Sequence, residues 1–179
     1  MEFNAGNKER GKSLLDEALP QATRIFGPDN QLTQRTMATH AYMLSKNGMM
    51  ELTQATEIIL AMRNKTNDVF TEINNIRRLG NLHAIAGQHI GARGYFQEAI
   101  SSHEMFYGDT KYVAQIELQI AECYVREGER AKAEEFYKSA LKRSSETTIT
   151  GTLEAKGGYD GEFAEAKREL EKLAASRAE

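Results

Sequence analysis

The chain has 179 residues, of which only two are proline and three are valine, and its formal net charge is −3. Because β-sheets are rich in β-branched side chains and their turns favour proline, this composition predicts an all-α protein and excludes most enzyme scaffolds built on a sheet. The near balance of charge gives no electrostatic reason to expect nucleic acid as the main partner.

The sequence lacks the marks of a membrane or secreted protein. Its longest run of apolar residues, Ile58–Met62, is far shorter than the roughly 20 residues that cross a bilayer. Residues 1–4 carry no apolar segment of the signal-peptide kind. The single cysteine, Cys123, cannot form an internal disulfide and fits a reducing compartment. We therefore expect a cytoplasmic protein without a membrane segment.

The first pattern along the chain is Gly6–Ser13, which reads G-x-x-x-x-G-K-S. In phosphate-binding loops of this kind, backbone N–H groups cradle phosphates and the lysine reaches them, but a buried strand must precede the loop. Residues 1–5 are too few and too polar for that strand. Nucleotide binding through Gly6–Ser13 is therefore a disfavoured alternative, and residues 1–9 are expected to be a flexible N-terminus.

Eight helices are predicted from the spacing of apolar residues. They span residues 10–26, 30–47, 51–64, 68–91, 95–107, 111–127, 130–143 and 161–176. Helix 10–26 looks like the second half of a hairpin whose first half is absent, so it offers an unpaired face to a homo-oligomer. Weak helix formers such as Thr150 and Gly151 predict a loop or frayed segment at 144–160, followed by a C-terminal capping helix and tail at 161–179.

A repeated spacing relates two hairpins in the second half of the chain. The interval from Gly94 to Gly128 equals the interval from Ala99 to Ala133. Each of the two glycines is predicted to end the first helix of its hairpin in a left-handed turn. Small residues suit the point where two helices cross most closely. Those expected there are Gly87, Ala99, Ala121 and Ala133.

These landmarks resemble the tetratricopeptide repeat family, whose unit of about 34 residues is a pair of antiparallel helices. The best units are 80–107 and 114–145, and the turn Phe-Gly-Pro-Asp-Asn at 26–30 is similar to the turn between the longer repeats of the kinesin light chain type. The resemblance implies a TPR-like α-solenoid over residues 10–143, a right-handed superhelix of about eight helices counted over the chain. It also implies a non-enzymatic scaffold for protein–protein interaction that uses no cofactor and no metal.

The resemblance places the binding surface on the concave face, which the first helix of each hairpin lines. The residues expected to line this groove are Arg35, Tyr42, Lys46, Asn81, Gln88, Gln115, Glu122 and Arg126. Their mixture of hydrogen-bonding, charged and apolar groups suits an extended peptide or a partner helix.

Other functions fit the sequence less well. His83 and His89 are six residues apart, whereas metal ligands on one face of a helix are three or four apart. Cys123 lies in the middle of a predicted helix, which does not activate a thiol. An RNA-binding protein of the pentatricopeptide type is an alternative, because its units are also helical hairpins, but it needs a positive surface and the second half of this chain is acidic.

Overall fold

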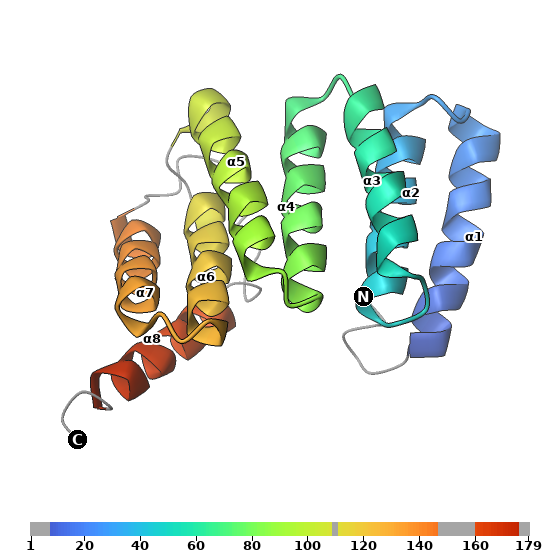
Figure 1. The fold of residues 1–179 in the computed structure, drawn as a ribbon. Coiled ribbons are helices and arrows are strands. Elements are labelled where there is room, and N and C mark those ends of the chain that lie inside the picture. The colour runs from blue at the N-terminus through green and yellow to red at the C-terminus, as the bar shows by residue number, and fades with distance from the viewer. Residues whose placement is uncertain (1–7, 109–110, 147–159, 176–179) are drawn as a thin grey trace. The chain divides into compact units, whose positions relative to one another are not determined.

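The computed structural model describes residues 8–108, 111–146 and 160–175, which form eight α-helices and no strand (Figure 1). The helices are α1 (Lys8–Phe26), α2 (Gln31–Lys46), α3 (Leu52–Lys65), α4 (Val69–Ile85), α5 (His89–Tyr107), α6 (Lys111–Arg126), α7 (Arg130–Glu146) and α8 (Asp160–Ala175). The prediction of an all-α helical-repeat fold is confirmed. Residues 144–146 of the predicted loop continue α7, and the rest of that loop up to residue 159 lies outside the described residues, as do residues 1–7 of the predicted flexible terminus.

The chain divides after Gly87 into two compact units. In the first unit each helix packs against the next, and α2 also contacts α4. Two hydrogen bonds join these helices side by side. The Thr33 hydroxyl donates to the carbonyl of Ala22 at 3.2 Å, which ties α2 to α1, and Arg78 of α4 donates to the Thr39 hydroxyl of α2 at 2.7 Å.

Glycines make the turns between helices, at Gly48 and Gly128 as the sequence predicts and at Gly87 instead of Gly94. Gly48, Gly87 and Gly128 follow α2, α4 and α6 with positive φ angles of 73°, 75° and 78°, a backbone region that only glycine enters without strain. Gly94, which the sequence spacing places at a turn, lies inside α5, and Gly161 lies inside α8. The predicted boundary between helices 68–91 and 95–107 was therefore wrong, because α4 ends at Ile85 and α5 begins at His89.

This correction changes the spacing between turns. The helices that end before the turns at Gly48, Gly87 and Gly128, which are α2, α4 and α6, begin at Gln31, Val69 and Lys111. Both of these intervals are longer than the tetratricopeptide unit of about 34 residues. The spacing between Gly94 and Gly128 relates a residue inside a helix to a residue in a turn.

The predicted small residues lie where the helices pack closely. Ala99, Ala121 and Ala133 are fully buried, in agreement with the prediction of close helix contacts. Gly87 is the exception, because it forms the turn after α4 and takes no part in a helix crossing.

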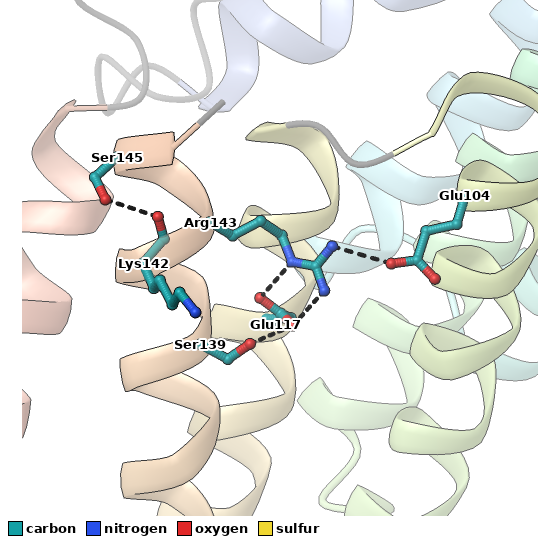
Figure 2. Close-up of polar contacts among 6 residues, drawn as sticks. All are labelled: Glu104, Glu117, Ser139, Lys142, Arg143 and Ser145. Atoms are coloured by element: carbon teal, nitrogen blue, oxygen red, sulfur yellow. Dashed lines mark hydrogen bonds and ion pairs between the residues drawn. The ribbon is translucent and has the colours of Figure 1, made fainter. Parts of the chain in front are cut away.

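The second unit consists of consecutive helix contacts from α5 to α8. A polar network joins its first three helices at one end (Figure 2). The buried carboxylate of Glu117 in α6 accepts hydrogen bonds from the Ser139 hydroxyl at 2.9 Å and from Nη2 of Arg143 at 3.3 Å, both in α7. Arg143 also donates from Nη1 to Glu104 of α5 at 3.0 Å. One guanidinium therefore fixes three helices to one another.

An aromatic cluster joins the same helices near the α6–α7 turn. The rings of Tyr124 in α6 and Phe136 in α7 stack with their centroids 5.6 Å apart. The guanidinium of Arg93 in α5 lies 4.2 Å from the centre of the Tyr124 ring and also forms an ion pair with Glu127. Such a cation–π contact adds about 0.5–2 kcal/mol to packing, so the α5–α7 layer is braced at both ends.

Candidate binding pocket

A pocket of about 550 Å³ lies in the second unit among α6, α7 and α8. From α6 it is lined by residues three or four positions apart, which therefore share one face of the helix: Gln115, Leu118, Gln119, Glu122, Val125 and Arg126. From α8 it is lined by Glu162, Glu165, Ala166 and Glu169, which share a face in the same way, and α7 contributes Tyr137. Its volume lies within the range of about 300–1,000 Å³ that is common for ligand pockets.

An apolar cluster builds the pocket by holding α8 against α6 and α7. Phe163 and Ala166 of α8 are buried together with Leu118, Ala121 and Tyr137 of the α6–α7 hairpin. Leu170 and Leu173 continue the apolar stripe of α8 and are partly buried against the same cluster. Because these four α8 residues are spaced three or four apart, an amphipathic helix at this point of the sequence brings its acidic flank over α6.

The rim of the pocket is acidic. Four glutamates line it, Glu122 of α6 and Glu162, Glu165 and Glu169 of α8, together with a single guanidinium, that of Arg126. Glu122 is exposed, but the protein around it displaces part of its hydration, which raises the pKa of its carboxyl; the charges of Glu162 and Glu165 raise it further, and Arg126 opposes them. The carboxylates therefore repel one another across the pocket.

Two of these carboxylates have hydrogen-bond partners within the second unit. Nε2 of the buried Gln115 donates to Glu162 at 3.2 Å and so links α6 to α8. The ammonium of Lys172 donates to Glu169 at 2.5 Å, one turn along α8. In the described part of the chain, no hydrogen bond or ion pair reaches Glu165, whose side chain is exposed.

Tyr137 forms part of the pocket floor. The residue is only 4% exposed, and within the described ranges its hydroxyl has no hydrogen-bond partner. Burial raises the pKa of Tyr137 to about 12, with smaller contributions from the charges of Glu122, Glu169 and Glu165. Tyr137 lines the pocket and its hydroxyl is not among the fully enclosed unpaired atoms of the described residues, so solvent reaches the hydroxyl from the pocket.

The pocket brings together three of the eight residues predicted to line a groove, namely Gln115, Glu122 and Arg126. The remaining five lie elsewhere: Arg35, Tyr42 and Lys46 on α2, Asn81 on α4, and Gln88 immediately before α5. On α2, the Lys46 ammonium lies 6.0 Å from the centre of the Tyr42 ring. Tyr42 also packs against the cluster of Leu15, Met43 and Leu44, so part of this side chain serves the core of the first unit.

Sequence reasoning missed the residues that α7 and α8 add to the pocket. The sequence predicted residues 161–179 only as a C-terminal capping helix and tail, with no part in binding. The signal that could have found them is their spacing of three, four and seven residues beside the apolar stripe, which gives one side of α8 a row of carboxylates.

The other candidate motifs do not form sites. Lys12 and Ser13 of the G-x-x-x-x-G-K-S pattern lie inside α1, where Lys12 pairs with Asp16 and the Ser13 hydroxyl donates to Glu17 at 3.3 Å. A phosphate loop needs free backbone N–H groups, which the interior of a helix lacks. Cys123 is buried, and burial raises the pKa of its thiol to about 11, which disfavours the reactive thiolate.

Neither a metal centre nor a membrane span is present in the part of the chain that the structure describes. No group of three or more His, Cys, Asp or Glu side chains in ranges 8–108, 111–146 and 160–175 is arranged to hold a metal ion. Within the same ranges, every helix is too short or too polar to span a bilayer.

The sequence profile of the tetratricopeptide repeat matches residues 72–146. Among solved structures, BtubC (BKLC) from P. vanneervenii is similar to this chain with a TM-score of 0.64 and 17% identity, over 98% of this chain and 75% of that chain. A putative kinesin light chain protein of Podosopora anserina with nearly identical TPR-like repeats is similar with a TM-score of 0.65 and 13% identity, over 98% of this chain and 81% of its own. At these identities the likeness shows the fold alone. No curated protein matches the sequence significantly.

Proposed function

Because residues 72–146 belong to the tetratricopeptide repeat family, we propose that the chain is a non-enzymatic scaffold that binds a protein or peptide partner through the α6–α7–α8 pocket. Scaffolds of stacked helical hairpins bind partners on the surface formed by successive first helices. Here α6 is such a first helix, and it supplies six residues of the pocket.

The observation that carries the proposal is the convergence of Gln115, Glu122 and Arg126 on one cavity. The family resemblance places these three residues on the face that binds partners. The cavity is a separate geometric feature of the structure, and the same three residues line it. An open cavity with an apolar floor and several hydrogen-bonding groups is suited to the side chains of a bound peptide.

The acidic rim supports a protein partner over a nucleic acid. A phosphate backbone binds to lysine and arginine, and four carboxylates against one guanidinium would repel it. The pentatricopeptide-like alternative therefore gains no support from this pocket. We place the scaffold in the cytoplasm, as the single buried cysteine suggests.

Affinity capture from the source cell tests the proposal. The full chain, a pocket variant that combines Glu122→Ala with Arg126→Ala, and a control variant that combines the exposed Glu135→Ala with Lys132→Ala would be compared by quantitative mass spectrometry. We expect the pocket variant to lose at least one partner that the parent and the control retain. If all three capture the same proteins in equal amounts, this pocket is not the binding surface.

Self-association through α1 is a separate part of the proposal. Leu14, Ile25 and Phe26 of this helix are exposed, and large apolar side chains grouped on one helix favour contact with another protein surface. Sedimentation of the parent and of a Leu14→Lys/Ile25→Lys variant would test it. A dimer that the variant does not form supports self-association, and a monomeric parent at all concentrations contradicts it.

A further inference from the structure

We propose that the α6–α7–α8 pocket receives a cationic side chain, lysine or arginine, from an extended segment of the partner. This inference rests on the proposed function, because it names the chemistry of the partner that the same pocket would bind. It assigns three groups to the interaction: the Glu122–Glu165 carboxylate pair, the Tyr137 hydroxyl and the apolar floor around Leu118.

The charge of the pocket is the first argument. Glu122 and Glu165 lie on opposite helices, and the charge of Glu165 contributes to the repulsion that Glu122 experiences. A cation between them would remove this repulsion and gain two charge-assisted hydrogen bonds, which are about twice as strong as neutral ones. An anionic side chain would meet only Arg126 as a favourable group.

The arrangement of the carboxylates favours an ammonium or guanidinium group over a divalent metal ion. A divalent metal ion needs oxygen ligands that converge within about 2.0–2.6 Å of one point. The carboxylates of this pocket do not converge in that way, since the described residues contain no cluster of three that could hold a metal ion. An ammonium or guanidinium group on a long side chain accepts hydrogen-bond partners at larger separations and in different directions.

The pocket floor is the second, independent argument. The Tyr137 side chain is buried, but its hydroxyl oxygen is not fully enclosed and has no protein partner in the described part of the chain, so it is left to water or to a ligand in the pocket. That hydroxyl can accept a hydrogen bond from an ammonium or guanidinium N–H. Leu118 and the Tyr137 ring offer an apolar bed for the methylene stem of lysine or arginine, whose charged end then reaches the rim.

Three synthetic peptides of ten residues would test the inference on the full chain. Each alternates leucine with a second residue, which is lysine, glutamine or glutamate, and carries a neutral fluorophore for anisotropy. We expect the lysine peptide to bind at least tenfold more tightly than the glutamine peptide, and the glutamate peptide to bind most weakly. Raising NaCl from about 50 to 300 mM should weaken only the lysine peptide, because salt screens exposed charges.

Matched variants locate the effect. Combining Glu122→Gln with Glu165→Gln should lower the affinity for the lysine peptide about five- to tenfold. The control combines Glu57→Gln with Glu135→Gln, which makes the same change in net charge at exposed glutamates outside the pocket, and it should change the affinity less than twofold. Tyr137→Phe should weaken the lysine peptide about threefold and leave the glutamine peptide unchanged.

Several results would overturn the inference. If the lysine and glutamine peptides bind equally, or if the control variant weakens binding as much as the pocket variant, recognition of a cation in this pocket is wrong. The absence of binding by all three peptides also contradicts it. None of these results decides the proposed function, because the capture experiment with Glu122→Ala and Arg126→Ala measures the native partner whatever its charge.

Discussion

Glu117 and Glu122 lie five residues apart on α6 and occupy opposite electrostatic environments. Glu117 is buried at the polar network, where Ser139 and Arg143 donate to it and where Arg143 also reaches Glu104 (Figure 2). Glu122 lines the pocket and is exposed, and partial loss of hydration together with the neighbouring charges of Glu162 and Glu165 raises the pKa of its carboxyl. Of two glutamates on the same helix, Glu117 therefore has its charge compensated by Arg143, whereas Glu122 is repelled by neighbouring carboxylates.

This difference distinguishes a carboxylate that stabilises the fold from one that is available to bind a ligand. A buried carboxylate that is held by an ion pair and hydrogen bonds, as Glu117 is, fixes the geometry of its neighbours, and removing its partner is strongly destabilising. A carboxylate held among like charges in an open pocket contributes little to stability, so its arrangement points to a ligand that supplies the missing cation. The pocket and the polar network should accordingly respond in opposite ways to substitution.

Phe163→Ala should produce the largest effect and break the pocket alone. Phe163 is buried between α8 and the α6–α7 hairpin, and replacing a buried phenylalanine with alanine costs about 3 kcal/mol or more. Hydrogen exchange should show faster exchange throughout α8, while the amides of α6 beside Glu117 keep their protection. Equal loss of protection in both places would show that the pocket and the network unfold as one.

Arg143→Met should break the polar network and leave the pocket intact. Methionine keeps most of the volume but removes the guanidinium that pairs with Glu117 and Glu104. We expect a loss of about 2 kcal/mol in the free energy of unfolding, below the range for fully buried pairs because the Arg143 side chain is 21% exposed. Urea denaturation measures the loss, and Lys142→Met serves as the control on the same helix.

Glu117→Gln tests the compensated carboxylate directly. Glutamine preserves the shape and can still accept from the Ser139 hydroxyl, but it loses the charge that pairs with Arg143. The free energy of unfolding should fall by about 1 kcal/mol, as expected when one charge-assisted hydrogen bond becomes neutral. A variant as stable as the parent would mean that the ion pair only offsets its own desolvation.

The fold could be predicted from sequence because its signals are local. Composition and apolar spacing indicated eight helices, and eight are found in the described residues. The turn at Gly87 was missed because the choice between Gly87 and Gly94 depends on which of them takes a positive φ. The spacing of residues along the sequence does not reveal which glycine has a positive φ. Gly94 and Gly128 therefore share a sequence interval with Ala99 and Ala133 without sharing a structural role.

The binding pocket could be predicted only in part, for a physical reason. Gln115, Glu122 and Arg126 lie on a single helix, so their shared face follows from the helical period. Glu165 and Tyr137 reach the same cavity from α8 and α7, and that meeting depends on how Phe163 seats α8 on the hairpin. The packing of helices that are distant in sequence cannot be predicted from the residue pattern of any one helix.

Glu122→Gln should produce the smallest change in the free energy of unfolding, and this change should be a gain in stability rather than a loss. Removing one of the mutually repelling carboxylates should stabilise the second unit at pH 7 by about a few tenths of a kcal/mol, because solvent screens these charges. The folded state raises the pKa of Glu122 above its value in the unfolded chain, so this group favours folding less as pH rises through that interval. The gain from glutamine should therefore be largest at pH 7 and shrink as the pH falls to about 4, below the ordinary pKa of glutamate, where protonation removes most of the repulsion.

Native-state hydrogen exchange of α6 amides at both pH values measures the small difference. Glu135→Gln is the matched control, since it removes the same charge from an exposed position outside the pocket and should show no such pH dependence. A gain from Glu122→Gln that is equal at pH 4 and pH 7 would contradict electrostatic repulsion and indicate a packing effect. Combined with the loss from Glu117→Gln, a pH-dependent gain would demonstrate that α6 carries one carboxylate used for the fold and another kept under repulsion for a ligand.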